Sequence, residues 1–134
     1  MSNRTTLEQG RAAEAYKYAV KGSELSKNSE YKAYVKKMPM YIKTNGLGAA
    51  MSFAFAKGSQ SGIPNRSKAW GLIYSQIEDW LKNYWDLVDF DKEETMMANL
   101  VEIKSPEYRA TTIEVLALLN WMRRFAEGLI TKED

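Results

Sequence analysis

The sequence predicts an all-α fold, a compact bundle of about six helices in a single domain spanning residues 1–134. Nearly every stretch between glycine and proline breakers repeats its apolar residues at helical spacing, and no segment has the alternation of a strand. The chain has 134 residues and 45% hydrophobic content, enough to bury about two thirds of its unfolded surface in one core. The longest apolar run, residues 47–56, is about half of a membrane span.

The first helix is predicted over residues 7–21. Thr6 and Gln9 fit a capping box at its start, and Gly22 is expected to end it. Residues 25–30 are polar and are expected to form a loop. A second helix is predicted over residues 31–38, ending before a proline, because its apolar side chains fall at i, i+3, i+4 and i+7: Tyr31, Tyr34, Val35 and Met38.

The most informative segment is KKMPMYIKTNGLGAAMSFAFAKG, residues 36–58. Pro39 has the fixed φ typical of the first turn of a short helix. Asn45 and Gly46 then predict a break, with Asn45 capping the next helix. Gly58 stands where a C-terminal glycine is expected. In the helix that follows Gly46, small residues recur at every fourth position and predict a ridge for close backbone packing: Gly48, Ser52 and Ala56.

The remaining residues predict a loop and three more helices. Residues 59–65 are expected to be a flexible loop inside the domain. The aromatic stripe of residues 70–85 is expected to be core, and stacking of bases on it is the alternative. Asp91 and Glu94 fit the start of a helix ending near Ile103. Ser105 as N-cap and Pro106 at N1 begin a final helix that Gly128 closes. Its apolar surface over residues 113–126 predicts a central C-terminal helix wrapped by the others.

The charge is unevenly distributed along a chain whose formal net charge is +2. Through residue 70 there are 12 basic and 4 acidic residues, and after it there are 7 basic and 13 acidic residues. This asymmetry predicts a basic surface for a polyanion and an acidic surface for another partner, unless folding mixes the two halves. The chain has no signal pattern and no cysteine, so we expect a cytoplasmic protein without disulfides, cofactor or membrane contact.

The residue types argue against an enzyme. Histidine and cysteine are both absent, which removes the commonest general base and the usual zinc ligands. No P-loop or dinucleotide-binding turn is present. Two weak signals remain. Ser29 and Lys32 match a serine–lysine nucleophile spacing by coincidence, in a turn expected to be exposed. An acidic group fits Mg²⁺ ligands but is more typical of a loop and helix start: Asp86, Asp89, Asp91, Glu93 and Glu94.

Nucleic-acid binding is a better hypothesis. Lysines gather around residues 32–43 and on both sides of the loop at residues 59–65, and phosphate contacts need cations on a rigid support. Arg123 and Arg124 lie on a largely apolar helix, where they either grip phosphate or pair with Glu114, Glu127 or the acidic segment. The lysines could equally be a solubilising face. The candidate RNA-binding residues are Lys36, Lys37, Lys43, Lys57, Arg123 and Arg124.

Three stretches together resemble one protein family. They are GRAAEAY at residues 10–16, PMYIKTNGLG with SFAFAKG at residues 39–58, and YRATTIEVLALLNWMRRFAEG at residues 108–128. The combination is similar to the small helical subunit of the Cmr complex, the type III-B CRISPR RAMP effector. None of the three is a catalytic motif. The family pattern marks as structural Pro39, Ile42, Asn45, Gly46, Leu47, Phe53, Trp121 and Phe125.

The resemblance implies a non-catalytic subunit that takes part in antiviral defence. Its expected partners are other subunits of the complex, guide and target RNA, and further copies of itself stacked along the assembly. A basic face of one copy could meet an acidic face of the next. The alternative is a helical adaptor that binds only protein and makes no direct RNA contact.

Overall fold

The computed structural model describes residues 3–85 and 95–131, with the side chains of residues 3–6 left aside. Within those ranges the chain forms six helices and a two-stranded hairpin, in the order α1 (Asn3–Ser23), α2 (Asn28–Asn45), α3 (Leu47–Gly58), β1 (Ser59–Gln60), β2 (Ile63–Pro64), α4 (Ala69–Asn83), α5 (Met96–Leu100) and α6 (Ser105–Leu129).

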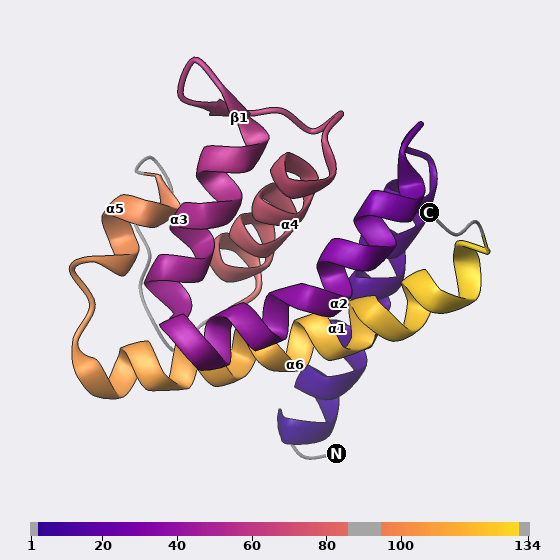
Figure 1. Ribbon diagram of the computed structural model, residues 1–134. Helices are drawn as coiled ribbons and strands as arrows, with labels where there is room; N and C mark the ends of the chain where they lie inside the picture. The colour runs from indigo at the N-terminus through magenta and orange to yellow at the C-terminus, as the bar shows by residue number, and fades with distance from the viewer. Residues whose placement is uncertain (1–2, 86–94, 132–134) are drawn as a thin grey trace.

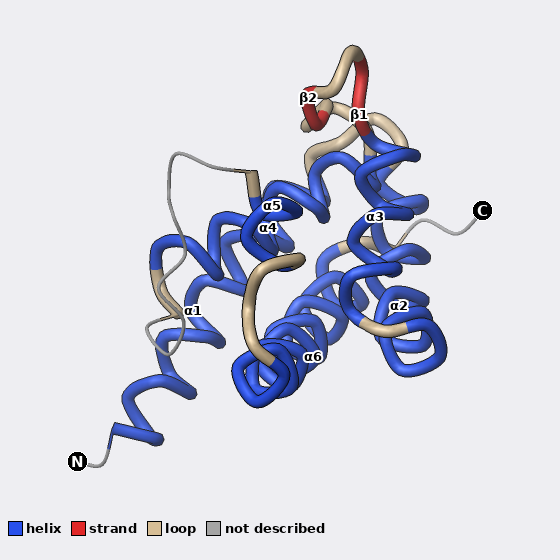
Figure 2. Tube along the Cα trace, turned by 90° about the vertical axis from the view of Figure 1, so that its left-hand side faces the viewer, coloured by secondary structure: helices blue, strands red, loops and turns tan. Residues whose placement is uncertain are grey.

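The helices form two groups that share one core (Figure 1). The longest helix, α6, packs along α1 and α2, and α3 packs against α4. The α2 helix contacts both groups because it also touches α3 and α4. Figure 2 shows the β1–β2 hairpin standing at the end of α3, away from α6. No helix in the described ranges has the length and apolar character to cross a bilayer.

The predicted all-α class with about six helices is confirmed. The last helix is central in that it packs against both α1 and α2, with Val115, Leu118 and Leu119 fully buried. One face of α6 nevertheless stays open, since Ile113 is 69% exposed. The aromatic stripe is core as predicted up to Leu81, whereas Tyr84 is 43% exposed.

Pro39 lies inside α2, so the prediction that one helix stops at Met38 and another starts at Pro39 is wrong. A proline in a helix interior removes a backbone hydrogen bond and costs about 3 kcal/mol. Side chains on both sides of it are buried, with Val35 and Met38 at 0% exposure and Ile42 at 2%. Burying each side chain contributes about 1.5–3 kcal/mol. Core packing therefore keeps the helix continuous through the proline.

The predicted break between α2 and α3 is confirmed, with Gly46 at φ 90° between Asn45 and Leu47. Asn45 does not cap α3, however, because the N-cap is Gly46 and no side-chain cap bond forms there. The backbone N–H of Gly48 instead donates to the Tyr108 hydroxyl at 2.6 Å. A Cβ at Gly48 would lie 3.2 Å from that hydroxyl. A side chain of α6 thus takes over the capping of α3.

Several other helix ends differ from the predictions by a few residues. Thr6 lies inside α1, which begins at Asn3. Ser105 is the first residue of α6 and Lys104 is its N-cap. Gly128 lies before the end of α6 at Leu129. The predicted pair Asp91 and Glu94 lies outside the described residues, and the N-cap of α5 is Thr95, whose side chain accepts from the Ala98 N–H at 3.1 Å.

Residues 59–65 are not a plain loop, because two short strands pair there in antiparallel fashion. Gln60 pairs with Ile63, and Ser59 pairs with Pro64. The turn residues Ser61 and Gly62 have φ of 52° and 79°. Two positive φ values in succession are typical of the tight turn that matches the twist of a hairpin. This pairing was not predicted, because strands of two residues are too short to show the alternation of apolar and polar residues that identifies a strand.

The backbones of α3 and α4 approach closely where Gly58, the last residue of α3, meets Gly71 in the first turn of α4. A Cβ built on Gly58 would lie 2.1 Å from the Gly71 nitrogen, and one on Gly71 would lie 2.1 Å from the Asn65 carbonyl oxygen. The Asn65 N–H donates to the Gly58 carbonyl at 2.7 Å across this crossing. Gly58 is therefore needed for packing inside the helix, and it is not the residue beyond the helix end that was predicted.

The small-residue ridge predicted on α3 has a different environment. Ser52 and Ala56 are exposed, and Gly48 meets the Tyr108 side chain instead of a backbone. The close approach that small residues permit is made further along the helix, at the Gly58–Gly71 crossing.

A buried charged cluster joins α1, α4 and α6. Glu114 is 3% exposed and Arg11 is 7% exposed. The Arg11 Nε donates to Glu114 Oε2 at 2.9 Å and its Nη2 donates to Oε1 at 2.7 Å. The Trp80 indole N–H also donates to Oε2 at 2.7 Å. The hydrogen bond to Glu114 raises the pKa of Arg11, so the guanidinium is held charged inside the bundle.

A second buried network joins α1, α2 and α4. The Tyr31 hydroxyl donates to Gln76 Oε1 at 2.7 Å, and Gln76 Nε2 donates to the Tyr18 carbonyl at 2.9 Å. Desolvation raises the pKa of Tyr31, so its hydroxyl stays a donor. Gly22 makes room for this ring, since a Cβ there would lie 2.1 Å from it. Gly22 is therefore a packing residue inside α1 and does not end the first helix.

Replacing Glu114 by Gln is expected to destabilise the fold by about 3 kcal/mol, because Arg11 would be left charged and buried with the half-exposed Glu8 as its remaining carboxylate partner. Urea unfolding followed by circular dichroism measures this change. The matched control is Lys17→Ala, which removes an exposed pair with Glu14 at 3.4 Å and should cost less than about 1 kcal/mol. Equal effects of the two changes would contradict a structural role for the buried cluster.

Gly71→Ala is expected to cost at least about 1–3 kcal/mol, since its Cβ would overlap the backbone across the α3–α4 crossing. The matched control is Gly128→Ala, whose Cβ would meet nothing within 4 Å. That change should stabilise α6 by about 1 kcal/mol through helix propensity. Thermal unfolding of both variants tests the crossing, and a neutral Gly71→Ala would show that the two backbones are not held this close.

Candidate nucleic-acid interface

The three predicted lysines of α2 are all exposed, but they do not share one face. Lys36 and Lys43 are seven residues apart, about 20° around the helix axis and about 10 Å along it. Lys37 lies about 100° around the axis from Lys36. The side chains of all three lysines are in contact with solvent. The helix that carries them is held by its buried face, so they are cations on a rigid support.

Lys57 belongs to a different group. It lies in the last turn of α3, and its ammonium is over the Phe53 ring, 5.8 Å from the ring centroid. Together with Lys27 and Lys68 it lines a cleft between α2, α3 and the start of α4. The structure therefore brings Lys57 together with two lysines that were not among the predicted binding residues.

The two predicted arginines differ in their partners. Arg123 forms an ion pair with Glu127 at 3.2 Å and donates to Asn120 Oδ1 at 3.1 Å. Arg124 is exposed, with its guanidinium 5.8 Å from the centroid of Trp121. Glu127 is therefore one of the acidic partners that the sequence suggested for the two arginines, and it pairs with Arg123. The exposed Arg123–Glu127 pair is worth at most about 1 kcal/mol, so an incoming phosphate could replace it.

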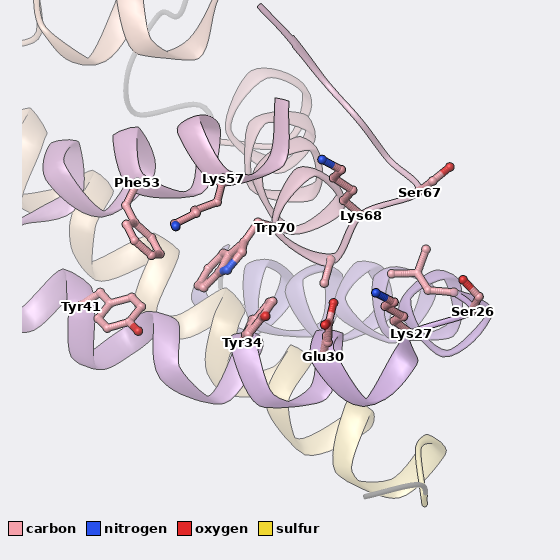
Figure 3. A pocket seen from close by; sticks show the side chains of 12 residues that line it. Ser26, Lys27, Glu30, Tyr34, Tyr41, Phe53, Lys57, Ser67, Lys68 and Trp70 are labelled. Carbon is pink, nitrogen blue, oxygen red and sulfur yellow. The ribbon is translucent and has the colours of Figure 1, made fainter. Parts of the chain in front are cut away.

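The cleft is the feature that sequence reasoning missed. Tyr34 and Tyr41 enter it from α2, Phe53 from α3 and Trp70 from α4, as Figure 3 shows. Its volume is about 580 Å³. We call this the aromatic cleft. The family pattern implied that Phe53 is structural, yet it is 39% exposed. One feature of the sequence could have indicated the cleft: Tyr34 and Tyr41 are seven residues apart, which places both rings on one side of α2.

The two weak enzymatic signals gain no support from the described residues. Ser29 is 8% exposed in the first turn of α2, so the expectation that it lies in an exposed turn is wrong. Within residues 3–85 and 95–131 no group of three or more acidic residues could hold a metal ion. The five carboxylates that were weighed as Mg²⁺ ligands, at residues 86–94, lie outside those ranges.

The fold and this surface define a small all-α protein that presents lysines and aromatic rings on a rigid bundle of helices. Its sequence matches the family described as CRISPR-associated protein (Cas_Cmr5) over residues 7–129. The chain therefore belongs to this family of CRISPR-associated proteins, and the resemblance found in its sequence is confirmed.

Two comparisons agree with this assignment. The chain is 26% identical over 130 residues to the CRISPR system Cmr subunit Cmr5 of Thermus thermophilus, with 97% of this chain and 98% of that protein covered. Its fold is similar to the crystal structure of a Cmr5-family protein from the same organism, with a TM-score of 0.68 and 25% identity. That match covers 97% of this chain and 99% of the other.

Proposed function

We propose that this chain is a non-catalytic small subunit of a type III-B CRISPR–Cas ribonucleoprotein, the Cmr complex, and acts in antiviral defence in the cytoplasm. In this role residues 1–134 form one domain that lines the groove for guide and target RNA. The observation that carries the proposal is the set of exposed lysines on α2 in a chain of this family. A second support is the match along almost the whole length to a relative named as a Cmr subunit.

The lysines suit a backbone contact that is independent of sequence. A lysine is a mobile point charge that attracts phosphate without reading a base. Each neutralised phosphate releases counterions, so binding should weaken steeply with salt. Lys36 and Lys43 are about 10 Å apart along α2, which places them within reach of separate phosphates of one strand.

The same charges give a physical reason for stacking of copies. The basic residues dominate the chain through residue 70 and the acidic residues dominate after it. A basic face that meets an acidic face on the next copy makes a head-to-tail contact, which extends along an assembly instead of closing into a dimer. Copies arranged in this way would present their α2 lysines at regular intervals along the RNA.

The triple variant Lys36→Gln, Lys37→Gln and Lys43→Gln is expected to weaken target-RNA binding by the reconstituted complex. For a single strand the slope of log K against log salt concentration should become shallower by about 1.4, because each lost phosphate contact contributes about 0.7 and Lys36 and Lys43 are the two lysines on one side of α2. Filter binding at several salt concentrations measures both quantities. The matched control neutralises three exposed lysines elsewhere, Lys17, Lys21 and Lys104, and should change the slope less.

An unchanged affinity and slope for the α2 variant, in a complex that assembles normally, would contradict the groove-lining role. That outcome would favour the adaptor function, in which the chain contacts only protein.

A further inference from the structure

The aromatic cleft contains large rings that the core does not enclose. Phe53 is 39% exposed, and Tyr34 and Tyr41 are partly buried at the edge of the hydrophobic cluster. A folded chain gains little stability from aromatic surface that stays in contact with water. Clustered exposed rings beside polar groups are typical of a binding site. The cleft therefore needs an explanation that packing of this chain does not provide.

The rings hold one another in fixed positions. Tyr34 stacks on Trp70 with centroids 4.6 Å apart and an interplanar angle of 9°. Phe53 meets Trp70 edge-on at 5.3 Å and 87°. Tyr41 lies 5.4 Å from Phe53 and 6.1 Å from Trp70. Because these contacts restrain the rings in the free protein, a flat ligand that stacks on them loses little affinity to side-chain ordering.

The charges around the rings favour an anion. Lys27, Lys57 and Lys68 line the cleft, against the single carboxylate of Glu30. Figure 3 shows the Lys57 side chain extending beside Phe53 into the cleft. The cleft is also lined by Lys68 and the first turn of α4, a 15-residue helix, whose N-terminal end carries partial positive charge. Stacking rings and cations thus stand side by side.

The size of the cleft fits a nucleotide. Its volume of about 580 Å³ falls within the range of roughly 300–1,000 Å³ that is usual for small-molecule sites. Base-stacking rings combined with backbone-binding cations are how proteins hold single-stranded nucleic acid without sequence preference.

We infer that the aromatic cleft receives one unpaired base of a single-stranded nucleic acid, stacked on Phe53 beside Tyr41, with a neighbouring phosphate held by Lys57 and Lys68. The inference rests on the proposed function and adds a base-dependent contact to the backbone contacts of α2. On this inference the cleft anchors a single-stranded part of the RNA, because a base inside a duplex is already stacked on its neighbours and has no free face for Phe53.

The test titrates the isolated full-length chain with adenosine monophosphate and separately with ribose 5-phosphate, followed by ¹H–¹⁵N NMR. The two probes carry the same phosphate, and only the first has a base. Adenosine monophosphate should shift the Trp70 indole N–H and the backbone amides of Phe53 and Lys57 in a saturable manner, whereas ribose 5-phosphate should bind about tenfold more weakly. Equal effects of the two probes, or no shift in the cleft, would overturn the inference; absence of shifts would point to a protein side chain as the occupant.

Phe53→Ala should weaken binding of adenosine monophosphate about tenfold in a protein that still unfolds cooperatively. The matched control is Tyr16→Ala, which removes a ring 48% exposed that meets Phe125 edge-on at 5.3 Å, and it should leave binding unchanged. If the α2 lysine variant weakens RNA binding by the complex while Phe53→Ala leaves the base-dependent shifts intact, the inference fails and the proposed function stands. If instead the α2 lysine variant binds RNA normally and Phe53→Ala abolishes the base-dependent shifts, the groove-lining role of α2 fails and the inference about the cleft stands.

Discussion

The close approach of two backbones at Gly58 and Gly71 is the constraint on which the candidate site depends. No side chain larger than hydrogen fits at either position without displacing the other helix. The residues that precede these glycines are Lys57 and Trp70, and both line the aromatic cleft. The crossing therefore sets the distance between a cation on α3 and the central ring on α4. The cleft is built on rigid helices whose separation is fixed by steric contact.

The three stretches that resemble the family meet one another in space. Arg11 of the first stretch forms the buried ion pair with Glu114 of the third. Gly48 of the middle stretch donates to the Tyr108 hydroxyl of the third. The recognisable pieces of this sequence are thus the residues that join α1, α3 and α6. In this chain the stretches that carry the family resemblance therefore also carry contacts between helices that are far apart in sequence.

The helices could be predicted from the sequence because their buried faces repeat at helical spacing, as in the aromatic stripe of α4. Helix ends could not, since contacts with other helices decide them. Core packing carries α2 through Pro39, and Tyr108 performs the capping expected of Asn45. The exposure of the predicted lysines followed from composition and periodicity. The aromatic cleft was missed because Tyr41, Phe53 and Trp70 come from three helices, and no local pattern brings them together.

We propose that α2, α3 and the start of α4 form the RNA-facing side of this protein. Ultraviolet cross-linking of the reconstituted complex to target RNA, with cross-linked residues identified by mass spectrometry, tests it most directly. The account predicts cross-links within residues 27–70, with Phe53 or Tyr41 among them because stacked aromatic rings lie closest to the bases. Cross-links confined to other subunits, or to α1 of this chain, would contradict it, whereas cross-links near Arg123 and Arg124 alone would move the RNA contact to α6.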